Sequence, residues 1–125
     1  QKIEAELVDP DAGVWETVAT IDNGELELTR EPVDVRATIA AAPGHAEALE
    51  RELRALVAPS RAEAGCLQYD LHQDRHDSHL FYMIEQWRDD AALERHQNTE
   101  HFLRFSRGNE ALLQNVKIDQ LYRLA

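Results

Sequence analysis

The sequence is poor in cysteine, in long apolar runs and in positive charge. Its one cysteine, Cys66, excludes an internal disulfide framework and fits a reducing compartment. No apolar run approaches the roughly 20 residues that a membrane-spanning helix needs, and no signal-peptide pattern is visible. We therefore expect a cytoplasmic protein with no membrane segment.

The shortage of positive charge is equally informative. Lys and Arg together number 13 against 24 Asp and Glu, which gives a net charge of −11. Ten of the acidic residues fall within residues 1–34, and the arginines are dispersed along the chain. Because such a chain repels phosphate backbones, the composition argues against a nucleic-acid partner.

The chain divides at Pro32 into an acidic extension, residues 1–32, and a regular domain, residues 33–125. In the extension, two short strands are expected around Asn23-Gly24, a pair that suits a tight hairpin turn. A helical fragment is expected over residues 2–9. The extension is too short for a core of its own, so we expect it to pack on the main domain or on a partner subunit.

In the domain, apolar residues alternate with polar ones over 33–40 and predict a strand. Leucines at helical spacing then predict a helix over residues 43–57. Pro59 is expected to kink or restart that helix, because it has no N–H to donate, and Gly65 to end it.

Two more strands follow, over 66–73 and 80–87, the second apolar on both faces as in a central strand covered on both sides. The next helix is expected in two pieces. Asp89 or Asp90 caps the first piece, and Thr99 caps the second. The second piece is expected to bury three apolar side chains, Phe102, Phe105 and Leu112.

A last strand over 116–124 completes the order β-α-β-β-α-β, which is the ferredoxin-like, split βαβ arrangement of an α+β protein. Helices on one side of its sheet leave the other face open. Tyr82 and Ile84 would lie on one face of the central strand, and Glu85 and Trp87 on the other. Since neither face is polar enough for water, we expect a homodimer with the two sheets packed together.

Several motifs in this domain have a familiar order and spacing. They are Pro43-Gly44 before the first helix, Gly65-Cys66 after it, Glu85-x-Trp87, and His96 followed by Thr99-x-x-Phe102. Together they resemble the antibiotic biosynthesis monooxygenase family over roughly residues 33–125. The resemblance implies a dimeric α+β barrel with a pocket between sheet and helices in each subunit.

The resemblance also implies a chemistry. Better-known members oxygenate electron-rich aromatic molecules such as quinols and anthrones without flavin, haem or metal, because the deprotonated substrate reduces dioxygen itself. The partners would then be a small aromatic substrate and dioxygen. Other members are isomerases, haem degraders or proteins without known activity, and fold alone does not choose among them. Haem degraders of this fold use an asparagine on the first strand, and the first strand expected here, residues 33–40, contains no asparagine.

The catalytic candidates are His96 and Glu85. An imidazole that titrates near neutral pH suits proton abstraction from a phenol, although surface histidines on helices often only bond a carbonyl. Glu85 could orient His96 or act as the base, or it could form a structural salt bridge to Arg36 or Arg88. Trp87 could stack on an aromatic substrate or be a plain core tryptophan.

Further substrate contacts are expected from Phe81, Met83 and Phe102 as apolar walls. Arg36 or Thr38 could hold the substrate anion. Four further side chains are weaker site candidates, because they suit the core, the interface or solvent equally well: Tyr69, Tyr82, Asn98 and His101.

A metal site is not expected. The turn over residues 72–79 has three histidines and two aspartates, but a turn needs polar residues anyway and no second cluster supports it. Cys66 is expected to be a small buried side chain rather than a nucleophile. The sequence thus favours a cofactor-independent monooxygenase. The alternatives are a non-catalytic barrel that binds a small hydrophobic ligand, and an isomerase that uses the same base without oxygen.

Overall fold

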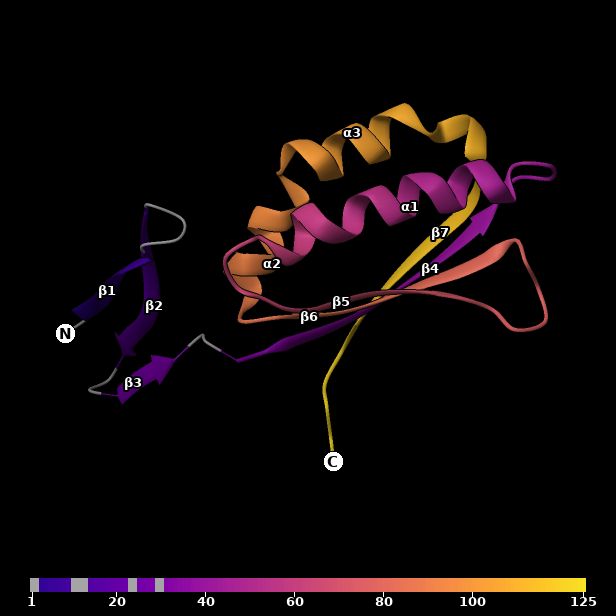
Figure 1. Ribbon diagram of the computed structural model, residues 1–125. Helices are drawn as coiled ribbons and strands as arrows, with labels where there is room; N and C mark the ends of the chain where they lie inside the picture. The colour runs from indigo at the N-terminus through magenta and orange to yellow at the C-terminus, as the bar shows by residue number, and fades with distance from the viewer. Residues whose placement is uncertain (1–2, 10–13, 23–24, 29–30) are drawn as a thin grey trace.

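The computed structural model of the protein describes residues 3–9, 14–22, 25–28 and 31–125, with side chains described from residue 31 onward (Figure 1). The elements are, in order, β1 (Ile3–Asp9), β2 (Val14–Asp22), β3 (Glu25–Leu28), β4 (Val33–Ala41), α1 (Ala46–Arg61), β5 (Cys66–Gln73), β6 (Leu80–Trp87), α2 (Asp90–Gln97), α3 (Glu100–Gly108), a 3₁₀ turn (Glu110–Leu112) and β7 (Leu113–Leu121). Within the described residues, no helix is both long and apolar enough to cross a membrane.

The first three strands form an antiparallel sheet in the order β1-β2-β3. Strands β2 and β3 pair with Asp22 opposite Glu25, and Asn23-Gly24 between them lies outside the described residues. The helix predicted over residues 2–9 is wrong, because Ile3–Asp9 is a strand paired with β2 along its whole length. Hydrogen bonds to a neighbouring strand outweigh the weak helix preference of Glu, Ala and Leu.

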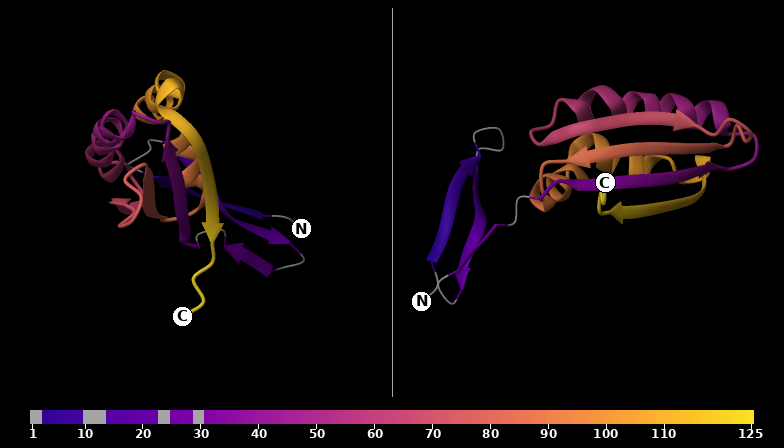
Figure 2. Two further views of the ribbon diagram at one scale, coloured as in Figure 1. Left: turned by 90° about the vertical axis from the view of Figure 1, so that its right-hand side faces the viewer. Right: turned by 90° about the horizontal axis from the view of Figure 1, so that it is seen from below.

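The second sheet has the order β5-β6-β4-β7, with all neighbours antiparallel. Figures 1 and 2 show α1 and α3 over one face of this sheet, while no helix of the described residues covers the other face. This is the predicted ferredoxin-like α+β arrangement, and the bounds predicted for β5 and β6 are correct to the residue. β7 lies about three residues earlier than predicted, because its register on β4 begins with Leu113 opposite Ala41.

The core lies between the sheet and the helices. It includes alternate residues of β4 and β6 and the apolar stripe of α1, namely Val35, Ala37, Ile39, Leu49, Leu53, Leu56, Phe81, Met83 and Trp87. Each large side chain of this set stabilises the fold by about 1.5–3 kcal/mol through burial. On the opposite face, the alternate residues of β6 are only half-buried, so one chain alone does not cover that side of the central strand.

The helices differ from expectation in three details. α1 continues through Pro59 to Arg61, since a proline in the last turn removes only one backbone bond. Gly65 does not end the helix but lies beyond its C-cap, Ala62, with a φ of +84°. The apolar side chains predicted to be buried by the later helical piece are half-buried instead: Phe102, Phe105 and Leu112.

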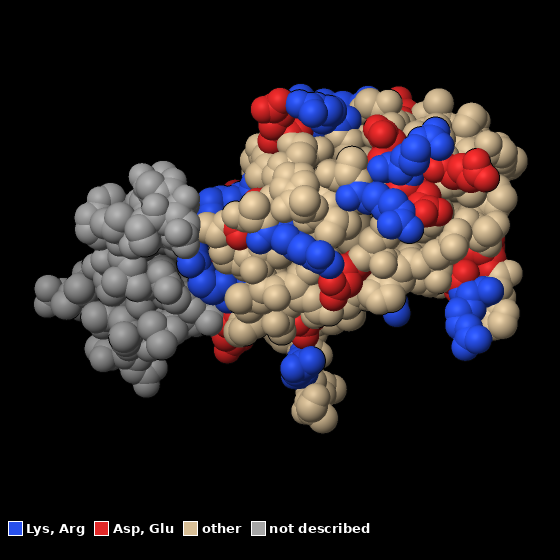
Figure 3. All heavy atoms as spheres, in the orientation of Figure 1, with Lys and Arg blue, Asp and Glu red and all other residues tan. Residues whose placement is uncertain are grey.

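Charged side chains of both signs are interspersed over the described part of the face in Figure 3. Several are paired locally, such as Arg54 with Glu50 at 2.7 Å and Arg61 with Asp70 at 2.8 Å. Such exposed pairs each contribute little to stability, about 1 kcal/mol or less. Their main effect is a mixed surface without a large basic patch on this face.

Candidate functional site

Three predicted site residues, Glu85, Trp87 and His96, lie together beneath the helices. Glu85 and Trp87 are two residues apart on β6, so both point to the helix-covered face. The His96 ring lies on the Trp87 ring, with 4.5 Å between centroids and 31° between planes. Trp87 Nε1 donates a hydrogen bond to Glu85 Oε1 at 2.9 Å. The three side chains therefore form one buried cluster.

Local capping places His96 over the sheet. The Asp89 carboxylate accepts a hydrogen bond from the Ala92 backbone N–H at 2.8 Å and so starts α2. At the other end, the Thr99 hydroxyl donates to the His96 carbonyl at 2.7 Å and accepts from the Phe102 backbone N–H at 3.3 Å. Thr99 thus joins the end of α2 to the start of α3, as its predicted capping role requires.

Glu63, in the turn between α1 and β5, also belongs to the cluster, although no sequence motif indicated it. Its Oε2 atom lies 2.7 Å from His96 Nδ1 and 2.6 Å from His101 Nε2. A carboxylate has no proton to donate, so we assign a proton to each of these two ring nitrogens. In neutral His96, the lone pair is then on Nε2.

Burial and negative charge both raise the pKa values of ionisable groups around His96. Burial raises the pKa of Glu85 above its usual value, and Glu63 adds to this, while the Trp87 hydrogen bond and His96 oppose it. Burial and then Glu85 raise the pKa of the Tyr69 phenol, so Tyr69 remains a hydrogen-bond donor. Burial, with Glu63 and Glu85, raises the pKa of the Cys66 thiol to about 11, which agrees with an unreactive cysteine.

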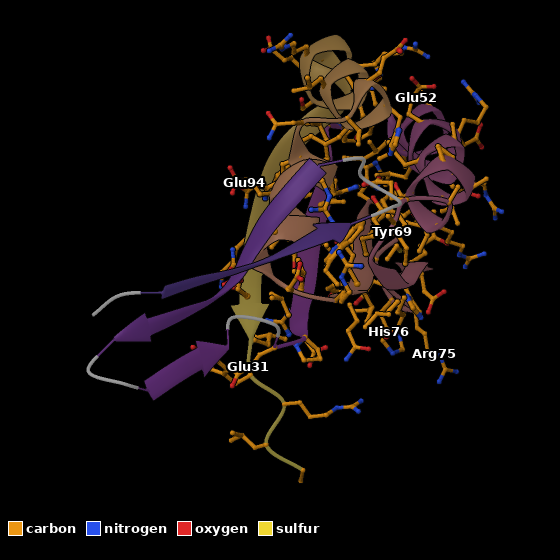
Figure 4. The ribbon with its side chains drawn as sticks, turned by 90° about the vertical axis from the view of Figure 1, so that its left-hand side faces the viewer. Glu31, Glu52, Tyr69, Arg75, His76 and Glu94 are labelled. Atoms are coloured by element: carbon orange, nitrogen blue, oxygen red, sulfur yellow. The ribbon has the colours of Figure 1, made fainter. Side chains whose placement is uncertain are left out.

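Aromatic rings enclose His96. Tyr69 and Phe102 meet the imidazole edge-on, with centroid distances of 5.4 Å and 5.1 Å. Figure 4 shows Tyr69 in the interior of the domain, whereas Arg75 and His76 lie apart from it in the β5–β6 turn. Trp87 is 0% exposed and His96 is 2% exposed. The candidate base is therefore closed off from solvent in this state.

Four hollows on the surface of the described residues are lined by other side chains, and none of the four reaches His96, Glu85 or Trp87. The second, a groove of about 460 Å³ between α1 and β5, reaches Phe81 and is also lined by Leu71. Because His96 is buried, a substrate that contacts its ring must displace neighbouring side chains.

The remaining predicted substrate contacts divide between the two faces of the sheet. Phe81 and Met83 are buried on the same face as Trp87, and Phe102 touches His96. Arg36 and Thr38 belong to the opposite, open face, where Arg36 forms an ion pair with Asp119 at 3.2 Å. The structure does not bring Arg36 and Thr38 to the His96 cluster.

The group of side chains that lie close enough together to bind a metal ion is outside the 72–79 turn. Among the described residues, Glu63, His96 and His101 form a group whose potential ligand atoms all lie within 4.8 Å of one another. In the turn, Asp74 accepts bonds from the His76 backbone and from Tyr82. The aspartates of the turn therefore shape the loop itself.

Comparison with known proteins supports the family resemblance. Residues 32–108 match the family model described as antibiotic biosynthesis monooxygenase. A Bacillus subtilis protein named "Putative monooxygenase YcnE" is 39% identical over 79 residues, which cover 62% of this chain and 83% of that protein.

Solved structures agree with the fold. The crystal structure of PA3566 from Pseudomonas aeruginosa is 90% identical with a TM-score of 0.75, covering 79% of this chain and all 100% of that one. The structure of Rv0793 from Mycobacterium tuberculosis is 31% identical with a TM-score of 0.72, covering 76% of this chain and 97% of that one. Since the family model spans more than half of the sequence, the chain belongs to the antibiotic biosynthesis monooxygenase family.

Proposed function

We propose that this protein is a cofactor-independent monooxygenase that acts on a quinol, an anthrone or a similar electron-rich aromatic molecule. Family membership supports monooxygenase chemistry in general. The observation that carries the finer proposal is the buried His96, which stacks on Trp87 and bonds Glu63 through Nδ1. This arrangement leaves a proton-accepting nitrogen, Nε2, in a dry and aromatic environment.

The proposed reaction begins with proton transfer from the substrate to His96 Nε2. The resulting substrate anion gives one electron to dioxygen, and the two radicals combine into a peroxide with a new C–O bond. His96 returns its proton to the peroxide anion, and the hydroperoxide then loses water together with the hydrogen left on the same carbon. This step gives the carbonyl product, so one oxygen atom enters the product and the other leaves as water. Glu63 stabilises the imidazolium that forms on His96, as a carboxylate beside a catalytic histidine does.

The other groups of the cluster have supporting roles. We assign the protonated Tyr69 phenol, whose ring contacts His96, as the donor for the substrate anion, since Arg36 and Thr38 lie on the far face of the sheet. Glu85 bonds Trp87 and fixes the orientation of the indole ring. Trp87, Phe81, Met83 and Phe102 form the apolar surroundings that exclude water.

Substrate entry requires displacement of α3. No residue of α3 is fully buried, and its contacts with the cluster include the His101–Glu63 bond and the ring contacts of His101 and Phe102 with His96. Such a weakly buried segment opens at lower free energy than the core strands. Movement of α3 would uncover His96 without disturbing β6.

We also propose that the protein is a homodimer that packs its open sheet faces together. The half-buried or exposed apolar side chains on that face support this arrangement: Leu80, Tyr82, Ile84 and Leu121. Analytical ultracentrifugation at micromolar concentration is expected to give a dimer, and a monomer would contradict the proposal.

Oxygen uptake by metal-stripped protein with a panel of quinols and anthrones tests the function. Uptake well above autoxidation is expected, with a loss of about 10²–10⁴-fold in His96→Gln, as for removal of a general base. His76→Ala, in the exposed β5–β6 turn, is the matched control and should retain full activity. Uptake at the autoxidation rate in all three proteins would refute the proposal.

A second candidate function is binding of a small hydrophobic ligand without catalysis. The closed packing around His96 and the open groove at Phe81 favour this alternative. Ligand binding without turnover would support it, whereas turnover without oxygen consumption would indicate an isomerase.

A further inference from the structure

We propose that Glu63, His96 and His101 form a binding site for one divalent transition-metal ion of the zinc class. The site comprises one carboxylate and two imidazoles, contributed by three different elements: the α1–β5 turn, α2 and α3. Their ligand atoms already converge, since His96 Nδ1 and His101 Nε2 both face the same oxygen of Glu63. This site shares His96 and Glu63 with the catalytic proposal, but the binding of an ion does not depend on that proposal.

The ligand types suit such an ion. Imidazole nitrogen and carboxylate oxygen bind zinc, cobalt and related ions, and three protein ligands leave a position for water. The Glu63 carboxylate also offsets part of the charge of a divalent ion.

The geometry needs only a small adjustment. Zinc bonds of about 2.0–2.2 Å at tetrahedral angles place ligand atoms about 3.3 Å apart. The present separations from the Glu63 oxygen are 2.7 Å and 2.6 Å, because hydrogens rather than an ion lie between the atoms. Movement of the Glu63 oxygen away from the two nitrogens by about 0.6–0.7 Å would give the required separation.

The site is firmly held yet accessible. His96 is fixed by its contact with Trp87, and the Thr99 hydroxyl ties the His96 carbonyl to the start of α3, where His101 lies. The side chains of His101 and Glu63 are 22% and 12% exposed, so an ion and its water ligand can enter from that side. A site with ordered ligands and an open edge binds without unfolding the core.

Metal binding would change the protonation of His96. An ion on Nδ1 takes the position of the Nδ1 proton, and a neutral imidazole then holds its proton on Nε2. The nitrogen proposed as the catalytic base would therefore no longer accept a proton. If the proposed function is correct, the metal-bound protein is the inactive form.

Zinc titration calorimetry on chelator-treated protein tests the site directly. One ion per chain is expected, together with a visible Co²⁺ absorption spectrum typical of nitrogen and oxygen ligands. Replacement of His101 by Ala, or of Glu63 by Gln, should weaken binding by more than about 100-fold, because loss of a ligand exceeds the effect of an outer-shell change. Circular dichroism confirms that each variant is folded.

The control is His79→Ala in the β5–β6 turn, whose ring is 43% exposed and outside the cluster. This variant should bind zinc like the natural sequence. The proposal is overturned if no saturable binding occurs, or if binding persists in His101→Ala and disappears in His79→Ala. Calorimetry reports on the metal site even if no substrate for oxygenation is found, so failures of the two proposals can be told apart.

Discussion

Replacement of Gly65 by Ala should destabilise the protein far more than replacement of Gly44, although the two glycines have nearly the same φ angle. Their φ values are +84° and +80°. A Cβ at Gly65 would lie 2.7 Å from the Ala92 Cβ of α2, whereas a Cβ at Gly44 would meet nothing within 4 Å. The pair therefore separates the cost of the backbone conformation from the cost of the contact.

The magnitudes follow from these two terms. A left-handed residue with a Cβ costs about 1–2 kcal/mol, offset by about 0.4–1 kcal/mol from the stiffer unfolded chain. Gly44→Ala should therefore lose about 1 kcal/mol. Overpacking against α2 adds about 1–3 kcal/mol, so Gly65→Ala should lose about 2–4 kcal/mol. For a domain of this size, each kcal/mol lowers Tm by about 4 °C.

Urea denaturation and thermal melts of the two variants measure the difference. The double variant with Ala92→Gly provides a further check, because it removes the atom that the new Cβ meets. In that background, Gly65→Ala should lose no more than Gly44→Ala does. Equal losses at Gly44 and Gly65 in the natural background would refute the reasoning, since the contact with α2 would then have no cost.

Three further predictions concern Glu85, Asp89 and Cys66. Because the folded-state pKa of Glu85 is raised, its protonated form favours folding at low pH, and this contribution is lost as pH rises through the folded-state pKa. Urea unfolding should therefore show Glu85→Gln gaining stability over the natural protein as pH rises above 4.5, the ordinary value for glutamate. Asp89→Ala should lose about 1–2 kcal/mol by removing the cap on the Ala92 N–H, while Asp89→Asn should lose much less, as judged by thermal melts. With a thiol pKa of about 11 instead of 9.0, Cys66 should hold roughly 100-fold less thiolate at pH 8 and react correspondingly slowly with iodoacetamide.

Each of these has a clear contrary result. A stability difference for Glu85→Gln that does not change between pH 4 and pH 8 would mean that burial does not alter this carboxyl. Equal losses in the Ala and Asn variants of Asp89 would rule out the capping bond as its main contribution. Alkylation of Cys66 at the rate of a free thiol would show that the thiol is open to solvent.

Local patterns in the sequence determined most of the domain. Alternation of apolar and polar residues located β5 and β6 to the residue, and leucine spacing located α1, because both patterns reflect which side chains face the core. The caps at Asp89 and Thr99 were also predictable, since a capping side chain bonds a backbone group only three residues away. The order of these elements, with the spacing of the Glu85, Trp87 and His96 motifs, indicated the family.

Other features depended on contacts between distant parts of the chain. Ile3–Asp9 is a strand because it pairs with β2. The residues of Ile3–Asp9 by themselves do not indicate that such a partner strand exists. Arg36 was a reasonable anion-binding candidate until pairing with β7 placed it beside Asp119 on the open face. Local propensity is weak compared with such pairing, so tertiary structure decides these cases.

The site shows the same division. The sequence itself determined that Glu85 and Trp87 share one face of a strand and that His96 lies on the following helix. Only the tertiary structure decided that Glu63 lies between His96 and His101, from which it is 33 and 38 residues distant along the chain. A hydrogen bond requires two atoms to be close in space, and separation along the chain does not show whether they are. These three side chains meet only because the α1–β5 turn, α2 and α3 pack against one another.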